Sequence, residues 1–377
     1  MRELVVDLAA IRENVRSVAA QVAPARLMGV VKADGYGHGM EQVARAMADA
    51  GIDAFGVVDL DEARRLREAG IRQPILAWIH GADADFGWAV SSGIELGIGS
   101  VENLERVALA AHEALAFARR TGAEARPAVV HLKADTGLGR GGALGAEWHE
   151  LVARAVELER AGAIVVRGVW THLANTSPDA DEDQFTAFDS AIAVARAAGL
   201  APELEHASAS ASMVSHPHQA RGMVRVGLAL YGLSTFPERT SAELGLRPAM
   251  EVGGEVVSVK RVPAGLGVSY GHRYVTERET TLVLIPLGYA DGLPRAATGR
   301  APVSINGKRY TIAATIAMDQ VVVDVGDDPV EVGDRAVFWG DPELGHPSAS
   351  EWADAAGTIP YEIVTRVGPR VRRRYLP

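Results

Sequence analysis

Lysine is scarce in this chain, and one lysine stands where it could react. Lys32, Lys133, Lys260 and Lys308 are the only four, while arginine fills most other cationic positions. Arginine stays protonated, whereas a lysine amine, with a free pKa of about 10.4, can lose its proton and attack a carbonyl. Lys32 ends an apolar run and is followed at once by glycines. This arrangement predicts a reactive amine at the carboxyl end of a strand.

Further polar residues follow other predicted strands. Thr171-His172 ends the sixth strand, Ser210 follows the seventh and Arg225 lies in the eighth, just before Gly227. Small residues after the seventh strand, with free backbone N–H groups after the eighth, are the usual phosphate site of an eight-stranded barrel. An amine beside a phosphate site suggests pyridoxal phosphate, held as a lysine Schiff base.

These residues can act together only if the fold brings the ends of their strands close to one another. The pattern of helices and strands along the sequence predicts such a fold. As far as residue 232, Ala-rich helices repeatedly end at a glycine, the residue favoured at a helix C′ position, and an apolar strand follows. Eight such units favour an α/β fold of the TIM (β/α)8 barrel type over an open doubly wound sheet. The predicted strands are 26–32, 54–59, 74–79, 94–98, 128–134, 164–173, 203–207 and 223–229.

The pattern changes after Tyr231-Gly232. Residues 233–248 read as a connector, and alternating apolar and polar residues then replace helical periodicity. We therefore predict a barrel at 1–235 and a mostly β domain at 236–377, with the strand at about 3–8 free to pair with the second domain. Asn306-Gly307 indicates a hairpin turn, and one short helix is expected near 350–356. The predicted runs are 251–262, 281–288, 302–305, 309–314, 320–325 and 335–340.

Composition excludes several classes of function. The net charge is −10, with the acidic residues spread out, which argues against nucleic acid or an anionic membrane as the main partner. Without cysteine there is no disulfide or thiolate site. His216-Pro217-His218 lacks a third ligand at suitable spacing, so we predict a loop there and no metal site. With no signal peptide and no bilayer-spanning stretch, we expect a soluble cytoplasmic protein.

Taken together in this order, several motifs resemble those of the alanine racemase family, and the resemblance covers nearly the whole chain. It implies a barrel carrying pyridoxal phosphate, a β domain, an amino-acid substrate and a homodimer whose second subunit completes each active site. The motifs are VVKADGYGHG, HLKADTGLGRGG, THLAN, HASAS, VRVGLALYGL, VSYGHRY, IPLGYADGLPR, AMDQ and AGTIPYEIVTRVGPR.

The resemblance implies a reaction in which two bases act on opposite faces of the substrate. Lys32 resembles the base for the D-isomer and the residue that holds the cofactor. Tyr270 resembles the base for the L-isomer, supplied by the partner subunit. Arg225 resembles the arginine that faces the pyridine nitrogen. Because arginine keeps its proton, that nitrogen should stay unprotonated, which weakens the ring as an electron sink and argues against decarboxylation.

The same resemblance assigns supporting roles. Arg140 would orient the substrate carboxylate, and Lys133 resembles a position that is often carbamylated and bridges to Arg140. Met318 and Asp319 resemble substrate contacts from the partner subunit. Departures from the usual pattern include Ala209, where the family usually has Asn, and Thr315, where it often has Arg. The implied cofactor ligands, besides Lys32 and Arg225, are Tyr36, His172, Ser210, Gly227 and Leu228.

Alanine racemisation, which would supply D-alanine for bacterial peptidoglycan, is therefore the expected function. A broad-specificity amino-acid racemase on the same scaffold is the nearest alternative. A non-catalytic pyridoxal phosphate carrier belongs to a different class, but such a protein would need neither Tyr270 nor residues 249–377.

Overall fold

The computed structural model describes residues 1–122, 124 and 126–377 and divides into two compact units. We call Val15–Gly35 with Met47–Leu230 the barrel unit. Met1–Asn14, Tyr36–Ala46 and Tyr231–Pro377 form the β-rich unit. Three helices contribute residues to both units, namely α1 (Leu8–Val22), α2 (Lys32–Tyr36) and α3 (Met40–Asp49).

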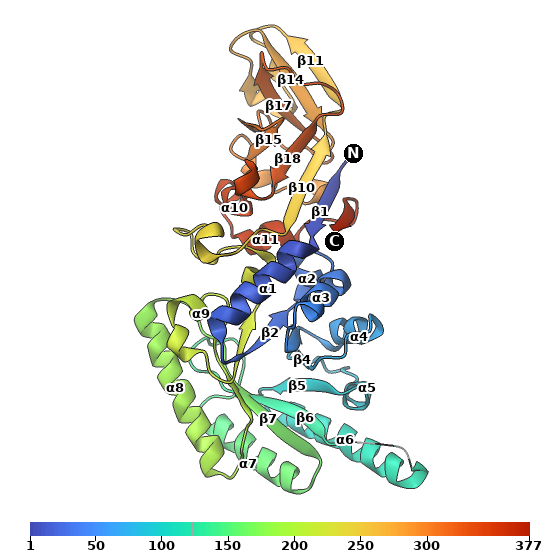
Figure 1. The fold of residues 1–377 in the computed structure, drawn as a ribbon, viewed down its shortest axis with the longest axis vertical. Helices are drawn as coiled ribbons and strands as arrows, with labels where there is room; N and C mark the ends of the chain where they lie inside the picture. Colours follow the sequence, from blue (N-terminus) through green and yellow to red (C-terminus); the bar gives the residue numbers. More distant parts are fainter. Residues whose placement is uncertain (123, 125) are drawn as a thin grey trace. The chain divides into compact units, whose positions relative to one another are not determined.

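The barrel unit contains one sheet of eight strands, which confirms the predicted fold class (Figure 1). Neighbouring strands run parallel, so their carboxyl ends lie at one edge of the sheet. Every residue of β3, β4 and β5 is buried, as expected for strands covered on both faces. In spatial order the strands are β8 (Leu204–His206), β7 (Ile164–Trp170), β6 (Ala128–Lys133), β5 (Ile94–Ile98), β4 (Ile75–Ala77), β3 (Ala54–Val57), β2 (Arg26–Val30) and β9 (Met223–Val226).

Local signals set the ends of the barrel helices. Ser100 and Ser177 accept hydrogen bonds from backbone N–H groups at the starts of α6 and α8, which satisfies donors that the helix leaves free. Gly122 ends α6 with a left-handed φ of 74°, a conformation in which glycine avoids Cβ strain. The helices are α4 (Leu60–Glu68), α5 (Phe86–Ser91), α6 (Val101–Thr121), α7 (Ala146–Arg160), α8 (Pro178–Ala197) and α9 (Ser212–Ser215), with short 3-10 turns η1 (Pro217–Gln219) and η2 (Leu228–Tyr231).

The β-rich unit is built on three sheets. Six strands pair in the order β16-β15-β18-β10-β1-β19, three in the order β11-β14-β17, and β12 pairs with β13. β1 runs antiparallel to β10 and parallel to β19, so both chain ends join one sheet. The strands are β1 (Glu3–Asp7), β10 (Met250–Glu255), β11 (Ser258–Val262), β12 (Gly267–Val268), β13 (Tyr274–Val275), β14 (Thr280–Ile285), β15 (Pro302–Ile305), β16 (Lys308–Thr311), β17 (Val321–Gly326), β18 (Arg335–Trp339) and β19 (Arg372–Leu376).

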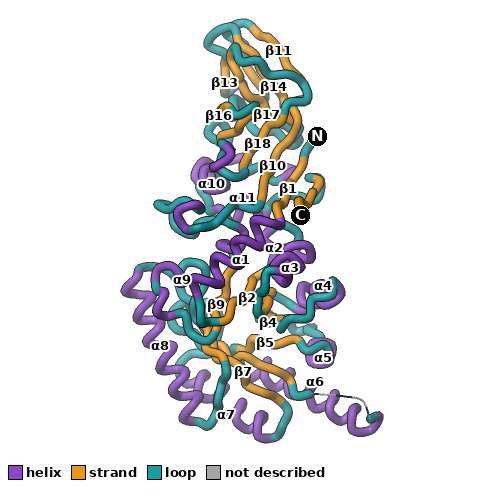
Figure 2. Tube along the Cα trace, in the orientation of Figure 1, coloured by secondary structure: helices purple, strands orange, loops and turns teal. Residues whose placement is uncertain are grey.

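Strands and loops make up most of residues 249–377 (Figure 2). The predicted hairpin is confirmed, because β15 and β16 pair around Asn306 and Gly307, whose φ values are 50° and 77°. The predicted helix near 350–356 is α10 (Ala349–Ala356). A second helix, α11 (Pro360–Thr365), was not predicted, and short 3-10 turns are η3 (Ala242–Leu244), η4 (Tyr270–His272), η5 (Tyr289–Asp291), η6 (Arg295–Ala297) and η7 (Pro342–Leu344).

The run predicted at 251–262 is two strands in different sheets. β10 belongs to the six-stranded sheet, whereas β11 pairs with β14 in the three-stranded sheet. The chain changes sheet at Val256-Val257, where Val256 is buried and Val257 is exposed. Alternation of apolar residues continues through this change, because the backbone stays extended while its pairing partners change.

Candidate active site

Lys32 lies two residues after the end of β2, where the backbone turns in an unusual way. Ala33, Asp34 and Gly35 have φ values of 53°, 54° and 63°, and Tyr36 follows at 52°. A left-handed backbone costs roughly 1–2 kcal/mol for each residue that carries a Cβ. The turn therefore stores strain, which the surrounding structure must offset.

Helix α4 supplies groups that hold this turn. The Ala33 N–H donates to Glu62 Oε1 at 2.7 Å, and the second oxygen of Glu62 accepts from the Val58 N–H at 2.8 Å. Arg65 forms an ion pair with Asp34 at 2.9 Å. Glu62 thus ties the peptide after Lys32 to the loop that follows β3, and so positions the amine.

Two lysines of the barrel unit lie in surroundings that disfavour their charge. Burial lowers the pKa of Lys32, and the nearby charge of Arg140 lowers it further, with Glu62 acting in the opposite direction. Burial together with Arg140 and Arg225 lowers the pKa of Lys133 to about 8. Both amines are therefore closer to a reactive neutral form than free lysine.

Arg225, from β9, is buried among hydrogen-bond acceptors. Its guanidinium donates to the carbonyl oxygens of His206, Thr171 and Ala207 at 2.6, 2.7 and 3.1 Å. It also faces His172 Nδ1 at 3.4 Å. Burial, with the charges of Arg225, Arg140, Lys133 and Lys32, lowers the pKa of His172 to about 3. His172 is therefore neutral and accepts from Arg225.

The loops after β8 and β9 meet at a small polar site. Ser210 Oγ accepts from the Gly227 N–H at 3.2 Å, and the Arg225 N–H donates to the Ser208 carbonyl at 3.0 Å. Leu228 is buried and begins η2. The structure thus brings together the predicted ligands Ser210 and Gly227, and their role as phosphate ligands stays a prediction.

Arg140 lies at the exposed end of the loop that follows β6. Asp135 Oδ1 accepts from the N–H groups of Gly137 and Gly139 at 3.0 and 3.1 Å, which fixes the path of the loop. The Lys133 amine lies 4.9 Å from the centre of the Trp170 ring. No hydrogen bond joins Lys133 to Arg140 among the described residues, yet the charge of Arg140 acts on the pKa of both lysines.

The barrel unit therefore concentrates positive charge in a protein of net charge −10. Lys32, Lys133, Arg140 and Arg225 all act on the pKa of His172. Across residues 1–122, 124 and 126–377, none of these four cations forms an ion pair with a carboxylate. Such an arrangement can attract anionic groups and hold a neutral amine beside them.

Three predicted site residues lie in the loops of the β-rich unit. Tyr270 begins η4 with 77 % of its surface exposed, and Thr315 Oγ1 donates to its carbonyl at 3.3 Å. Thr315, a departure from the family pattern, thus supports the loop that carries Tyr270. Met318 is 51 % exposed. Asp319 is also exposed and forms an ion pair with Arg370 at 2.7 Å.

Tyr36 belongs to the β-rich unit, where its ring is buried. It packs against Tyr231 and Tyr361, with ring centroids 4.8 and 6.2 Å apart. These ring contacts fix the orientation of the Tyr36 side chain. They agree with a role in packing as well as with the predicted role as a phosphate ligand.

Four polar residues of the barrel unit were not singled out from the sequence. Glu62 holds the turn after Lys32, and Glu95, His131 and His206 form a buried hydrogen-bonded series with Arg225. The available signal was a polar residue inside an otherwise apolar strand, since Glu95 interrupts β5 and His131 interrupts β6. Such a residue requires a buried partner.

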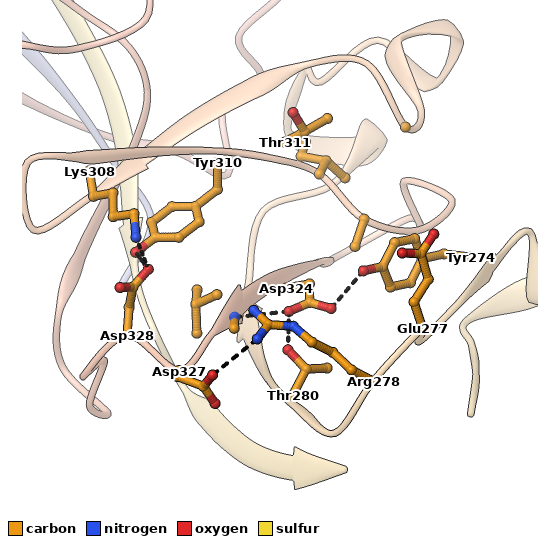
Figure 3. Close-up of a pocket in the computed structure, with 15 residues that line it drawn as sticks. Tyr274, Glu277, Arg278, Thr280, Lys308, Tyr310, Thr311, Asp324, Asp327 and Asp328 are labelled. Atoms are coloured by element: carbon orange, nitrogen blue, oxygen red, sulfur yellow. Dashed lines mark hydrogen bonds and ion pairs between the residues drawn. The ribbon is translucent and has the colours of Figure 1, made fainter. Parts of the chain in front are cut away.

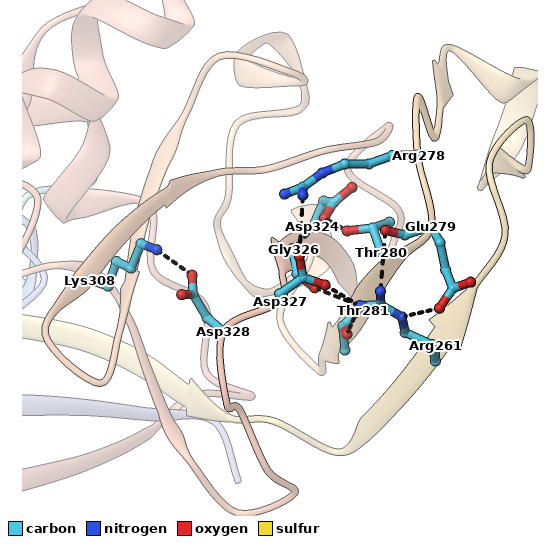
Figure 4. A network of polar contacts seen from close by, with 10 residues as sticks. All are labelled: Arg261, Arg278, Glu279, Thr280, Thr281, Lys308, Asp324, Gly326, Asp327 and Asp328. Carbon is cyan, nitrogen blue, oxygen red and sulfur yellow. Dashed lines mark hydrogen bonds and ion pairs between the residues drawn. The ribbon is translucent and has the colours of Figure 1, made fainter.

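The β-rich unit contains a separate cavity of about 810 Å³ (Figure 3). Asp324 lies on its wall and accepts from the Tyr274 hydroxyl at 2.6 Å and from the Thr280 hydroxyl. Lys308 pairs with Asp328, while Arg278 and Arg261 both pair with Asp327 (Figure 4). None of the predicted site residues lines this cavity.

Among the described residues, no group of three or more His, Asp or Glu side chains is arranged to hold a metal ion. Within the same residues, no helix combines the length and apolar character needed to cross a bilayer.

The chain matches two family models, the alanine racemase N-terminal domain over residues 6–235 and the alanine racemase C-terminal domain over residues 249–375. It is 48 % identical over 373 residues to the alanine racemase of Thermobifida fusca, covering 98 % of this chain and 96 % of that protein. It is 43 % identical over 383 residues to that of Mycobacterium avium, covering 100 % and 95 %.

The fold matches the crystal structure of alanine racemase from D-cycloserine-producing Streptomyces lavendulae with a TM-score of 0.95. Sequence identity to that structure is 45 %, and the match covers 100 % of this chain and 97 % of that one. Both halves of the sequence and the fold thus agree, and the chain belongs to the alanine racemase family of isomerases.

Proposed function

We propose that this protein interconverts L- and D-alanine with pyridoxal phosphate as its cofactor. The observation that carries the proposal is the group of four cations around neutral His172, one of which is the pKa-lowered amine of Lys32. An anionic cofactor and an anionic substrate carboxylate both need positive charge, and the cofactor aldehyde needs a neutral amine.

The donor set of the barrel unit fits pyridoxal phosphate. Lys32 would carry the cofactor, Ser210, Gly227 and Leu228 would hold its phosphate, and Arg225 and His172 would face its ring. The bound cofactor supplies delocalisation of the negative charge that develops at the substrate Cα. Arg225 keeps its proton when it donates, which limits that delocalisation and disfavours competing reactions such as decarboxylation.

Proton transfer is assigned to two side chains on opposite faces of the substrate. Lys32 Nζ would remove or return the proton on the face used by D-alanine, as its lowered pKa favours. The Tyr270 hydroxyl would do the same on the face used by L-alanine. With 77 % of its surface exposed in the single chain, Tyr270 is available to a second copy. We therefore propose a homodimer in which each subunit lends Tyr270, Met318 and Asp319 to the other.

The substrate carboxylate is assigned to Arg140, with the Met318 N–H as a second donor. Lys133, whose pKa is lowered to about 8, would react with carbon dioxide as a neutral amine. A carbamylated Lys133 would be an anion, able to bridge to Arg140 and hold it in place.

The reaction suggests a biological setting. D-Alanine would serve as a peptidoglycan precursor in the cytoplasm of a bacterium. The relatives that support this setting are bacterial proteins named alanine racemase.

The test is exchange of the α-proton in deuterated water, followed by proton NMR for a panel of L- and D-amino acids with the pyridoxal phosphate-loaded protein. We expect exchange with inversion, confined largely to alanine. Exchange across many side chains would instead establish a broad racemase. Silence with every amino acid, despite bound cofactor, would overturn the proposal in favour of a carrier.

A further inference from the structure

Arg225 is a buried charge whose protein partners are carbonyl oxygens and imidazole rings rather than a carboxylate. Only 5 % of its surface is exposed. A buried charge is costly unless it is compensated. The structure therefore raises the question of which anion balances this guanidinium.

A series of hydrogen bonds leads from Arg225 to one carboxylate of the barrel unit. Arg225 lies 3.1 Å from His206 Nδ1, and His206 Nε2 lies 2.8 Å from His131 Nδ1. His131 Nε2 then lies 2.8 Å from Glu95 Oε2. Both rings are fully buried, and Glu95 is 7 % exposed. The series thus runs from β9 through β8 and β6 to β5, within one unit.

The backbone of β7 leaves room for this path. Gly168 pairs with His131 of β6 on one side and with Leu204 of β8 on the other, and a Cβ at Gly168 would stand only 2.2 Å from His131 Nδ1. Any side chain there would displace the ring. The glycine therefore allows rings from β6 and β8 to meet across the intervening strand.

The two ends of the series determine where every proton lies. Arginine can only donate, so His206 Nδ1 accepts and the proton of the neutral ring is on Nε2. That N–H donates to His131 Nδ1, which places the His131 proton on Nε2 as well. The His131 N–H then donates to Glu95, and an ionised carboxylate can only accept. Burial and Arg225 lower the pKa of His206 far below its usual value, in agreement with a neutral ring.

Glu95 is held in the ionised form from its outer side. His131 and Arg167 both bond to it, and these contacts lower its pKa against the opposing effect of burial. Arg167 also pairs with the exposed Glu203 at 3.2 Å. The series therefore starts at the surface and ends at Arg225.

We propose that Glu95 is a positioning residue for Arg225, acting as its counter-charge through the Nε2–H tautomers of His131 and His206. Without the negative charge of Glu95, neither ring would be held in its Nε2–H tautomer. The Arg225 guanidinium would then lose the acceptor that fixes its orientation. The tautomers follow from hydrogen bonds alone, whereas an effect on racemisation rests on the proposed function.

Glu95→Gln makes a sharp test because glutamine cannot satisfy both neighbours. If its oxygen faces His131, its NH2 group faces Arg167, and two donors oppose each other. If its oxygen faces Arg167, its NH2 group needs an acceptor at His131 Nε2, so both rings must reverse and His206 would turn an N–H toward Arg225. Glu203→Gln is the matched control, because Glu203 bonds the same arginine without touching either ring.

The experiment is long-range proton–nitrogen NMR of the full-length protein labelled with 15N-histidine, with and without pyridoxal phosphate. Spectra of His131→Gln and His206→Gln assign the two rings. We expect both rings to be neutral Nε2–H tautomers at pH 7 in the wild type and in Glu203→Gln, and at least one to change tautomer or gain a proton in Glu95→Gln. An Nδ1–H or doubly protonated ring in the wild type would overturn the proposal.

Kinetics supply a second measurement. For alanine, Glu95→Gln should lower kcat roughly tenfold, a typical coupling within one hydrogen-bonded network, with a smaller change in KM. Glu203→Gln should match the wild type. If Glu95→Gln does not fold, Arg167→Gln leaves the rings intact and should produce a smaller loss of kcat in the same direction. Equal spectra and rates for the Glu95 and Glu203 variants would exclude the positioning role, whatever the substrate.

Discussion

Charged side chains cluster both in the barrel unit and around the cavity of the β-rich unit. The two clusters differ in whether their cations are paired with carboxylates. Around the cavity, Lys308, Arg278 and Arg261 pair with Asp328 and Asp327 (Figure 4). Around His172, four cations stand without a paired carboxylate among the described residues. Local neutrality leaves little field for a ligand, whereas uncompensated charge attracts one. Excess charge, rather than cavity volume, is therefore the feature on which we base the proposed site.

The pKa values of ionisable groups also shift in opposite directions in the two regions. Burial and the bond to Asp324 raise the pKa of Tyr274 to about 12, so this hydroxyl keeps its proton. Burial together with Asp328 raises the pKa of Tyr310 to about 12. In the barrel unit, burial and neighbouring cations lower the pKa of Lys32 and Lys133 instead. Only the second environment prepares a group to give up a proton near neutral pH.

Lys32→Ala should produce the largest effect. This change removes the amine that we propose carries the cofactor and moves a proton, so alanine racemisation should fall by about 10⁴-fold or more. Lys308→Ala removes one of the other three lysines of the chain and breaks its pair with Asp328 and its contact with the Tyr310 ring. Its rate should stay near that of the wild type. A comparable loss in both variants, measured by optical rotation, would contradict the contrast between the two regions.

Tyr270→Phe should lower the rate of α-proton exchange unequally for the two isomers of alanine. We expect α-proton exchange in deuterated water to fall by about 10²- to 10⁴-fold when L-alanine is the starting isomer, and far less when D-alanine is. Tyr274→Phe is the matched control, since it loses a hydroxyl bonded to Asp324 and should cost about 1 kcal/mol of stability with little change in rate. Equal losses in both directions for Tyr270→Phe would refute the two-base assignment.

Glu62→Gln should loosen the turn after Lys32. The glutamine amide can accept from only one of the two backbone N–H groups that Glu62 now binds. Misplacement of the amine should lower racemisation roughly tenfold. Loss of the negative charge should also lower the pKa of Lys32 further, as measured by the pH dependence of amine modification in the cofactor-free protein. Glu68→Gln, at the exposed end of the same helix, should change neither quantity.

Asp324→Asn should separate stability from activity. Asp324 accepts from two hydroxyls and from the Gly326 N–H, and an amide NH2 group cannot replace all of these acceptor positions. We expect unfolding to become easier by about 1–3 kcal/mol, measured by urea denaturation, while racemisation at 25 °C remains. A catalytic defect in a protein of unchanged stability would assign the cavity a role in function.

Lys133→Met should have the smallest effect, and it depends on pH. The folded-state pKa of Lys133 is lowered to about 8, while an unfolded lysine titrates near about 10.4. Between these values the unfolded chain binds more protons, so stability rises with pH there, and below pH 8 the folded state carries the full cost of the charge. In bicarbonate-free buffer the variant should therefore be more stable than the wild type at pH 7. That advantage should shrink by pH 10, and an advantage independent of pH would contradict the lowered pKa.

Much of the fold could be predicted from the sequence, because its signals are local. Glycines at helix ends, alternation in the later strands and Asn306-Gly307 each depend on a few neighbouring residues. The change of sheet between β10 and β11 could not be predicted, since partners from distant segments decide it. The roles of Lys32 and Tyr270 rest on motifs and stay predictions. The environment of Lys32 was not readable from those motifs.

Residue types and spacing alone placed an arginine in the last barrel strand, and they predicted a reactive lysine and a phosphate-binding pair of loops. Only the tertiary structure decided the hydrogen-bond partners, the burial and the protonation of those residues. Glu95 and His131 are 36 positions apart, and His131 and His206 are 75 apart, yet hydrogen bonds join them. The order and register of the strands bring such residues together, and burial then fixes their protonation, because charge and unpaired polar groups are costly away from water.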